Sequence, residues 1–514
     1  MQKKNWISTL SAFMKPSNIA MLFLGFSAGL PILLIFSSLS LWLREAGVER
    51  SAVTFFSWAA LGYSFKFIWA PLVDRIPLPV IGKLGRRKSW MLLSQGSIMV
   101  AIIGMGLTNP VAAESSLTVM ALFAVLLGFS SATQDIVIDA YRIESDVPDM
   151  QAILSSTYIA GYRIGMNVAG AGALFLASYL GSTKEVYSYS AWMWTYIIMA
   201  LCMLVGVFTT IVIPEPTTDR SLEESYSTKD YLNFFVLFLI LTGVFIFSFF
   251  MTGKVTTDIK ASLVSYVGKG FGGFFLEAVK MCFSILAAVI VGKLILKTSF
   301  VNRKMVENTY VAPVKDFFTR YGKEISILLL CLIGLYRVSD IVLGVISNVF
   351  YQDLGFTKDQ IAAIVKTFGL IMTLVGGFLG GVLTVRFGVM KILMWGAILS
   401  AGTNLLFMAL AEMGNNLPML YLVISADNLA AGLASAAFIA FLSSLTNISF
   451  TAVQYAIFSS LMTLLPKVFG GYSGSMVDSF GYSNFFLITT FMGLPVLVLI
   501  WLAKKKLDLA QAPK

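Results

Sequence analysis

Residues 19–43 read IAMLFLGFSAGLPILLIFSSLSLWL and contain no charged side chain. A helix needs about 20 apolar residues to cross the roughly 30 Å hydrocarbon core of a bilayer, so this stretch predicts a membrane-spanning helix. It is too long for the apolar core of a signal peptide, and we expect the helix to be retained. The rest of the chain is similar, because 57% of its 514 residues are hydrophobic and 12% are charged. The alternating pattern of a membrane barrel is absent, so we expect an all-α polytopic membrane protein.

Thirteen further stretches have a similar length and polarity, which gives fourteen expected transmembrane helices in a pattern of six, two and six. We expect an N-terminal half at 1–215, a linker with two extra helices at 216–323, and a C-terminal half at 324–514. The polar segment 214–230 and the basic segment 297–324 separate these groups. The expected spans are 19–43, 52–73, 89–108, 116–140, 152–180, 190–213, 231–252, 274–297, 325–350, 360–386, 390–411, 417–442, 451–476 and 484–503.

Positive charge is concentrated in four places, and fourteen crossings put all four on one side of the membrane. Short loops rich in Lys and Arg stay in the cytoplasm, so we expect both termini there. The loops on the other side, at 109–115, 181–189, 412–416 and 477–483, are nearly free of positive charge. The basic residues are Lys3, Lys4 and Lys15, then Arg75, Lys83, Arg86, Arg87 and Lys88, then Arg303, Lys304, Lys315, Arg320 and Lys323, and finally Lys504, Lys505 and Lys506.

An internal repeat follows the second helix of each six-helix half. Residues 71–88 contain PLVDR and GKLGRRK, and residues 380–391 read GGVLTVRFGVMK. Both segments resemble G-x-L-x-D-R-x-G-R-R/K, the loop signature of major facilitator transporters. The second copy has Val385 where the acid belongs. The resemblance implies two facilitator halves, with a gate formed by Asp74, Arg75, Arg86, Arg87, Asp139 and Arg386.

Three longer runs carry a closer resemblance. They are SATQDIVIDAYR at 131–142, GYRIGMNVAG at 161–170, and DNLAAGLASAAFIAFLSSLTNISFTAVQYAIFSSL at 427–461. These runs resemble the muropeptide permease (AmpG) family of bacterial inner-membrane transporters. The resemblance implies proton-driven uptake of N-acetylglucosaminyl-anhydromuropeptides from periplasm to cytoplasm, for peptidoglycan recycling and, in some bacteria, β-lactamase induction. The alternative is a carrier of the same fold for another bulky anion, such as an acetyl-CoA-like compound or a peptide.

Acidic residues inside the expected spans are candidate proton carriers, because charge within the membrane is costly. Asp135 and Asp139 are i,i+4 and share one face of the helix 116–140. We expect Asp135 to carry or relay the proton and to pair with Arg163 of the next helix; the alternative is a static ion pair. Asp340 and Asp427 are the other candidate proton-coupling acids. Asp139 lies near the end of its helix, where we expect it to hold the basic loop.

Cations within the spans are the candidate partners of an anionic substrate. A muropeptide stem carries several carboxylates, and arginine can bind a carboxylate through two parallel hydrogen bonds. Amide and aromatic side chains are the expected partners of the sugar. The candidate substrate-binding residues are Arg163, Arg337, Lys66, Lys366, Gln134, Tyr162, Asn428 and Lys467.

Several function classes are disfavoured. The chain has no histidine, which excludes His-based proton relays and His metal sites. Its three cysteines lack metal-ligand spacing, so we expect no metal and no cofactor. A membrane enzyme would need a catalytic cluster on a sizeable soluble loop, and the two-half repeat argues against a receptor. We therefore expect a monomeric carrier in the lipid bilayer that moves protons and substrate and binds no nucleic acid.

Other patterns predict packing. The extra helices at 231–252 and 274–297 should lie outside the transport path, with Glu277 and Lys280 neutralising each other. Gly161 and Gly165 form a GxxxG pattern, which is typical of close helix packing in membranes. Tryptophans near helix ends usually anchor at the membrane interface, and we expect this of Trp42, Trp69 and Trp90.

The expected topology can be tested by reporter fusions. Fusions after residues 88, 315 and 510 should report a cytoplasmic location, because each follows a strongly basic segment. A fusion after residue 185 should report the periplasm. A periplasmic signal at residue 510 would contradict the fourteen-helix topology.

Overall fold

The computed structural model describes residues 11–48, 63, 65–113, 115–182, 186–216, 226–255, 269–357, 360–470 and 473–511. Every regular element in these ranges is a helix, which confirms the all-α expectation. Eleven described helices are long and apolar enough to cross a membrane, and they coincide with eleven of the fourteen expected spans. Of the other three, 52–73 lies largely outside the described residues. The remaining two correspond to described helices, so the count of fourteen stays a prediction.

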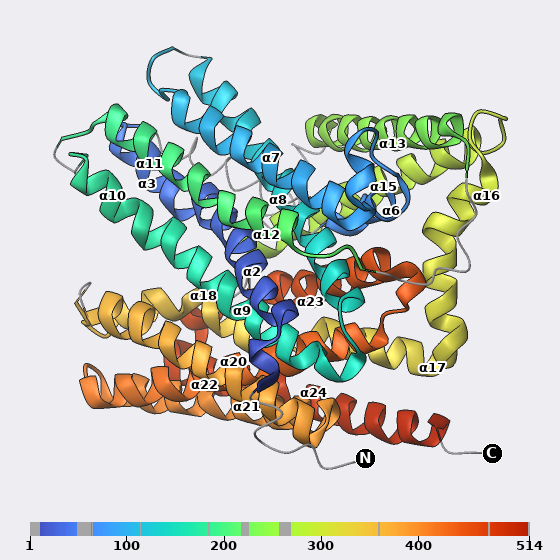
Figure 1. Cartoon of the computed structure of the whole chain (residues 1–514). Helices are drawn as coiled ribbons and strands as arrows, with labels where there is room; N and C mark the ends of the chain where they lie inside the picture. The colour runs from blue at the N-terminus through green and yellow to red at the C-terminus, as the bar shows by residue number, and fades with distance from the viewer. Residues whose placement is uncertain are drawn as a thin grey trace.

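The N-terminal half is drawn in blue to green in Figure 1. Its first expected helix is broken at Phe36, whose φ of −94° and ψ of −88° are not helical. Only the end of the second helix is described, as a short turn, η3 (Lys66–Ile68), followed by α6. The other elements are α2 (Pro16–Ile35), α3 (Ser37–Glu45), α6 (Ala70–Arg75), α7 (Arg86–Leu107), α8 (Ser116–Glu144), α9 (Gln151–Asn167), α10 (Ala173–Tyr179), α11 (Tyr189–Cys202) and α12 (Leu204–Val212).

The C-terminal half, yellow to red in Figure 1, lies below the N-terminal half in that view. The single helix expected at 325–350 is instead broken at Arg337, whose φ is −100° and ψ is 10°. This break places Arg337 at the start of a helix. The elements are α17 (Ala312–Leu335), α18 (Val338–Asp353), a π-helical turn η8 (Ile361–Phe368), α20 (Gly369–Phe387), α21 (Val389–Met413), α22 (Leu417–Leu445), α23 (Thr451–Gly470) and α24 (Ser473–Gln511).

The extra helices α13 (Thr228–Val255) and α15 (Lys269–Ile295) pack against each other at one edge of the molecule (Figure 1). In the most apolar window of α13, 11% of the residues are buried, against 61% in the first membrane span. The ring of Phe234 on α13 lies 5.8 Å from that of Tyr310, which ties this helix to the following segment. The position of the pair is in keeping with the expected place outside the two halves.

The segment expected as a basic linker, 297–324, is largely helical. It contains α16 (Arg303–Val306), a π-helical turn η7 (Glu307–Val311) and the first turns of α17. The chain bends at Gly322, whose φ of 75° favours glycine, before α17 continues into the C-terminal half. Tyr310 donates to the Ile68 carbonyl, and Gln454 of α23 donates to Asp316. This segment therefore contacts both halves.

Glycines bring α2 and α9 into backbone contact. A Cβ atom on Gly161 would lie 1.9 Å from the carbonyl oxygen of Leu22, and one on Gly25 would lie 2.2 Å from that of Tyr158. Gly165 faces Phe26 in the same way. The close packing expected from the GxxxG pattern is confirmed, and it fixes the position of α9, which carries Tyr162 and Arg163.

Two of the expected interface tryptophans are instead buried in the N-terminal half. Trp42 is fully buried and stacks on Trp192 with ring centroids 5.7 Å apart. Trp69 is also buried, and its indole donates to Thr133 at 3.1 Å. The interface role expected for these two residues is wrong, because aromatic and polar partners from neighbouring helices surround them.

The glycine contact predicts a sharp difference between two conservative substitutions. Gly161→Ala forces a methyl group into the Leu22 carbonyl, and overpacking of this kind costs about 1–3 kcal/mol. Gly172→Ala is the matched control, because its Cβ meets nothing closer than 3.9 Å. Thermal unfolding in detergent should show a lower midpoint for Gly161→Ala than for Gly172→Ala. Equal midpoints would contradict the packing described.

Candidate functional site

A cluster of charges lies on one face of α8. Asp135 and Asp139 are 8% and 7% exposed. Lys66 approaches Asp139 at 3.5 Å from η3, and Arg142, one turn further along α8, approaches it at 3.4 Å. Because two acids face two bases, the cluster is formally neutral, as buried charges need to be.

Tyrosines line the cluster. The Tyr63 hydroxyl donates to Ser131 at 2.6 Å, and the rings of Tyr158 and Tyr162 lie 6.1 Å apart. Tyr158 and Tyr162 both lie close enough to Asp135 to interact with its charge. In the described part of the chain, oxygen Oδ1 of Asp135 has no hydrogen-bond partner. This acid is therefore buried with one oxygen unsatisfied, which is costly for a carboxylate.

Gln134 also turns toward the interior of the N-terminal half. Its amide nitrogen donates to the Ser27 hydroxyl of α2 at 3.1 Å. Its amide oxygen is buried and has no hydrogen-bond partner among the described residues. Gln134 therefore has an unused hydrogen-bond acceptor on the face of α8 that meets α2.

The structure does not form the expected ion pair between Asp135 and Arg163. The charges nearest Asp135 belong to Lys66 and Asp139, whereas the charge that acts most strongly on Arg163 is that of Arg337. Asp135 belongs to the face of α8 that meets η3, which explains the difference. Arg163 of the N-terminal half and Arg337 of the C-terminal half are thus near each other across the boundary between halves.

A second charged cluster lies in the C-terminal half. Arg337 donates to Ser435 at 3.0 Å and approaches Asp340 at 3.8 Å. Asp427 accepts a hydrogen bond from Thr403 at 3.3 Å. The next residue, Asn428, accepts one from Thr373 at 2.8 Å. The three candidate residues Arg337, Asp340 and Asp427 are thus brought together.

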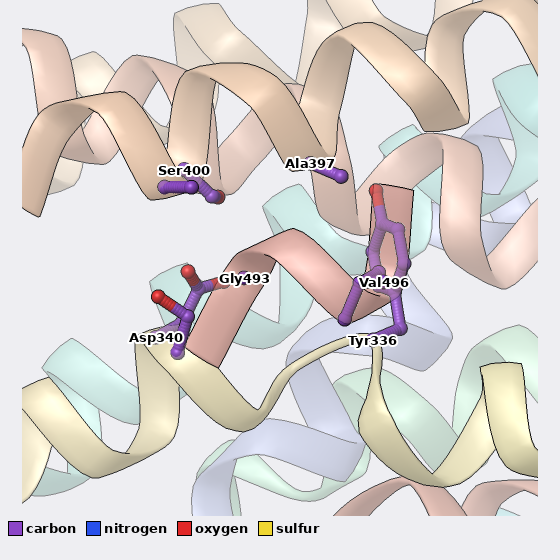
Figure 2. Close-up of a pocket in the computed structure, with 8 residues that line it drawn as sticks. Tyr336, Asp340, Ala397, Ser400, Gly493 and Val496 are labelled. Atoms are coloured by element: carbon purple, nitrogen blue, oxygen red, sulfur yellow. The ribbon is translucent and has the colours of Figure 1, made fainter. Parts of the chain in front are cut away.

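A small cavity borders Asp340. Figure 2 shows Asp340 and Ser400 facing each other across it, with Tyr336 at one side. Its volume of about 10 Å³ is close to what one water molecule needs. The C-terminal cluster therefore has room for a single water beside its acid.

The facilitator-like loop is fastened by a different acid from the one expected. Arg87 is buried and pairs with Asp74 at 2.8 Å and with Glu144 at 2.6 Å. Glu215 accepts the backbone N–H groups of Arg87 and Lys88 and thereby caps α7. The acid that holds the loop is Glu144, because Asp139 is engaged by Lys66 and Arg142.

Glu144 and Arg142 were missed because the expected helix ended at residue 140, whereas α8 continues to Glu144. A charged, helix-compatible run directly after an apolar span was the available signal. Glu215 lies in the polar segment after the sixth helix, and nothing in the local sequence indicates its partner.

The other arginines expected in the gate lie in the two repeat loops, and each has a defined contact. Arg86 donates to the Asp74 carbonyl at 3.1 Å. Arg75 lies over the ring of Phe450, in the C-terminal half, at 6.0 Å. In the second copy of the loop, Arg386 lies over the ring of Phe387 at 5.8 Å.

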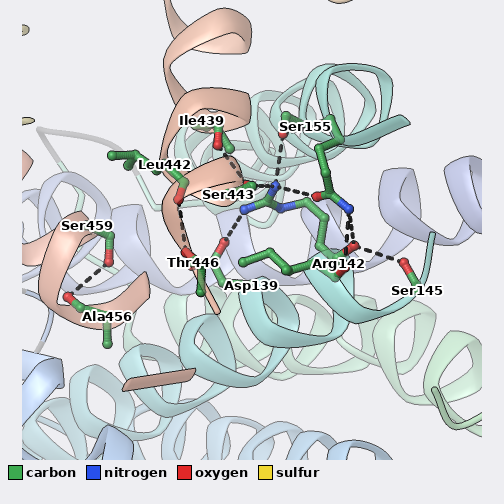
Figure 3. Close-up of polar contacts among 12 residues, drawn as sticks. Asp139, Arg142, Ser145, Ser155, Ile439, Leu442, Ser443, Thr446, Ala456 and Ser459 are labelled. Atoms are coloured by element: carbon green, nitrogen blue, oxygen red, sulfur yellow. Dashed lines mark hydrogen bonds and ion pairs between the residues drawn. The ribbon is translucent and has the colours of Figure 1, made fainter. Parts of the chain in front are cut away.

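Helix α8 also joins the two halves (Figure 3). Arg142 donates to Ser443 of α22 at 2.8 Å, and its guanidinium lies 5.0 Å from the ring centre of Tyr455. Thr451 of α23 donates to Glu144. These contacts close the end of the molecule that carries the basic loops.

The remaining candidates lie apart from these clusters. Lys366 is exposed on η8. Lys467 is on α23, but its side chain lies outside the described residues, as does that of Glu277. Lys280 lies over the ring of Phe249 at 4.5 Å.

Comparison with family models gives two matches. Residues 328–513 match the Major Facilitator Superfamily model. Residues 19–230 match a model described as Acetyl-coenzyme A transporter 1. The two matches fall on the two halves.

Whole-length relatives are also found. The chain is 30% identical over 485 residues to putative transporter AmpG 4 of Rickettsia conorii, covering 94% of this chain and 96% of that protein. It is 27% identical over 500 residues to the anhydromuropeptide permease of Escherichia coli K12, covering 97% and 82%.

Solved structures share the fold. The proton:xylose symporter XylE bound to 6-bromo-6-deoxy-D-glucose superposes with a TM-score of 0.61 at 13% identity, covering 96% of both chains. FucP in the outward conformation superposes with a TM-score of 0.58 at 11% identity, covering 96% of this chain and 99% of FucP. At these identities the likeness concerns the fold alone, which is that of the major facilitator superfamily.

The loop cluster predicts that two adjacent basic residues differ in importance. Arg87→Gln leaves Asp74 and Glu144 without their shared cation, and breaking a buried pair costs about 3–5 kcal/mol. Lys88→Gln is the control, because among the described residues the Lys88 side chain has one bond, an exposed one to the Ile211 carbonyl, and surface changes cost within about 0.5 kcal/mol. Unfolding titrations in mixed micelles would measure both. Similar losses in the two variants would show that the buried pair is not what holds the loop.

Proposed function

Because the chain belongs to the AmpG family of major facilitator transporters, we propose that it imports N-acetylglucosaminyl-anhydromuropeptides together with protons. The protein is a multi-pass membrane transporter and not an enzyme. The proposed location is a bacterial inner membrane, with both termini in the cytoplasm. The proposed role is peptidoglycan recycling and, in some bacteria, β-lactamase induction.

The observation that carries the proposed substrate class is that the charges of Arg163 and Arg337 act on each other across the two halves. Among the described residues, Arg163 has no carboxylate within ion-pair distance, and Arg337 is 3.8 Å from its acid. Two neighbouring guanidinium groups repel each other, and a substrate carboxylate between them would remove that repulsion. Stem-peptide carboxylates fit this requirement, and the amide of Gln134 and the hydroxyl of Tyr162 are suited to the sugar.

The proposed proton carrier is Asp135. Protonation would relieve the cost of its unsatisfied oxygen. It would also leave one excess positive charge on the neutral cluster, which would attract an anionic substrate into the same space. Asp340 and Asp427 remain the alternative acids, because both lie near Arg337.

The proposed direction is inward. Basic loops mark the cytoplasmic side of a membrane protein, and the contacts of Arg142 and Glu144 close that side here. A carrier closed toward the cytoplasm receives substrate from the periplasm. This arrangement supports an importer poised to load.

A second candidate substrate is an acetyl-CoA-like anion. It is favoured by the match of residues 19–230 to the acetyl-coenzyme A transporter model. Both substrates are bulky anions that two arginines could bind. This candidate is tested by adding unlabelled acetyl-CoA during uptake of labelled anhydromuropeptide. Acetyl-CoA reduces this uptake if it binds at the same site.

Proteoliposome uptake under a pH gradient tests the function. The wild type should concentrate labelled anhydromuropeptide. Asp135→Asn should accumulate less than the wild type by about tenfold or more, because it lacks a positioned proton-transfer group. Counterflow exchange needs no net proton movement and should be less affected. Asp146→Asn, the same change in the loop after α8, is the matched control.

Two outcomes would count against these proposals. Absence of uptake by the folded wild type would reject the substrate. Accumulation at wild-type rates by Asp135→Asn would make Asp135 structural and would move the proton to Asp340 or Asp427.

A further inference from the structure

We propose that Arg142 transmits the charge state of the α8 acid cluster to the contact that closes the cytoplasmic side. Arg142 is then a positioning residue, acting between the proton site and the gate. The inference rests on the proposed proton coupling and adds the physical link from that site to the movement of the halves.

Arg142 has two sets of partners on its two terminal nitrogens. Nη2 faces Asp139 at 3.4 Å, within the acid cluster. Nη1 donates to Ser443 of the C-terminal half at 2.8 Å and to Ser155 of α9 at 3.0 Å. Figure 3 shows this fork between α8, α9 and α22. One fully buried side chain therefore contacts the acid and the opposite half at the same time.

Asp139 balances two cations, Lys66 and Arg142. The titratable and charged groups facing it come from four elements. They are Lys66 of η3, Asp135 and Arg142 of α8, Tyr158 and Tyr162 of α9, and Tyr455 of α23. The ring of Tyr455 also lies under the Arg142 guanidinium, so the second half contributes to the same cluster.

A proton added to the Asp135–Asp139 pair removes one of the two charges that compensate Lys66 and Arg142. A buried guanidinium that loses its compensation is driven toward water. Movement of Arg142 toward water breaks its bond to Ser443 and its contact with Tyr455. The cytoplasmic side then loses two of its fastenings, and the halves can separate there.

The serine partners offer a matched pair of variants. Ser443 and Ser155 both accept from Nη1 of Arg142, but only Ser443 belongs to the other half. Ser443→Ala removes the bond across the boundary, whereas Ser155→Ala removes a bond within the N-terminal half. A general loss of polar contacts would affect both variants alike.

The readout is the distance between spin labels at Leu84 and Phe387. These residues are 50% and 48% exposed and lie on the two repeat loops of opposite halves. The background lacks Cys202, Cys282 and Cys331, and the protein is held in nanodiscs without substrate. A hydrogen bond to a charged group corresponds to about a tenfold change in an equilibrium, so Ser443→Ala should raise the open-to-closed ratio by about tenfold.

Ser155→Ala should leave the open-to-closed ratio within about twofold of the wild type, since the bond from Arg142 to Ser443 remains. Tyr455→Leu is a second variant that removes the ring contact, and it should also favour the open form. Arg142→Lys keeps the charge but not the fork, and should behave like Ser443→Ala. Equal shifts in Ser443→Ala and Ser155→Ala would overturn the proposal.

The link to the acids is tested by pH and by a double variant. The wild type should shift toward the open form when the pH falls from 7.5 to 5.5. Asp139→Asn should be open at both values, and Ser443→Ala should add nothing to it, because both act through Arg142. Additive effects, or a wild type that ignores pH, would overturn the link.

These measurements need neither substrate nor transport. Failure of muropeptide uptake would reject the proposed substrate while leaving the label distances interpretable. Conversely, proton-driven uptake with pH-independent distances would uphold the proposed function and reject the role of Arg142.

Discussion

The ion pairs of buried Arg87 with Asp74 and Glu144 are the interaction that holds the end of the molecule carrying the basic loops. Glu144 also accepts a hydrogen bond from Thr451, so the acid that holds the loop within one half also fastens the other half. A buried charge must be compensated, and here each charge is compensated by a partner from another segment of the chain. Separation of the halves at this end breaks the bonds from Thr451 to Glu144 and from Arg142 to Ser443, whose charged members are held by ion pairs within the N-terminal half. A transporter that alternates between two closed ends needs a connection of this kind.

Helix α8 contributes most of these groups. Along its last three turns it carries Asp135, Asp139, Arg142 and Glu144, which face successively the tyrosine-lined interior, Lys66, the opposite half and the basic loop. One helix thus connects the proposed proton site with the gate. The glycine contact between α2 and α9 gives this helix a fixed neighbour, because backbones that touch leave little freedom for sliding.

The sequence predicted much of the fold, because apolar length and Lys/Arg distribution are direct consequences of the bilayer. Close helix packing at Gly161 and Gly165 was predicted for a similar reason, because only small residues permit it, but the partner helix α2 was not. Which charged residues pair across neighbouring helices was harder to predict. Spacing relates residues on one helix, such as Asp135 and Asp139, but does not determine which neighbouring helix each one faces. Asp135 therefore lies near Lys66 and not Arg163, and Glu144, not Asp139, holds the loop. The break at Arg337 was also not predicted; there the Arg337 side chain donates to Ser435 of α22.

Charge movement in the acid cluster and substrate movement are, in the proposed mechanism, one process. Simultaneous recording of internal pH and labelled anhydromuropeptide in proteoliposomes, started without a pH gradient, tests it most directly. Adding substrate outside should acidify the lumen in step with uptake, and Asp135→Asn should abolish the acidification. Substrate entry with no change of internal pH would contradict it.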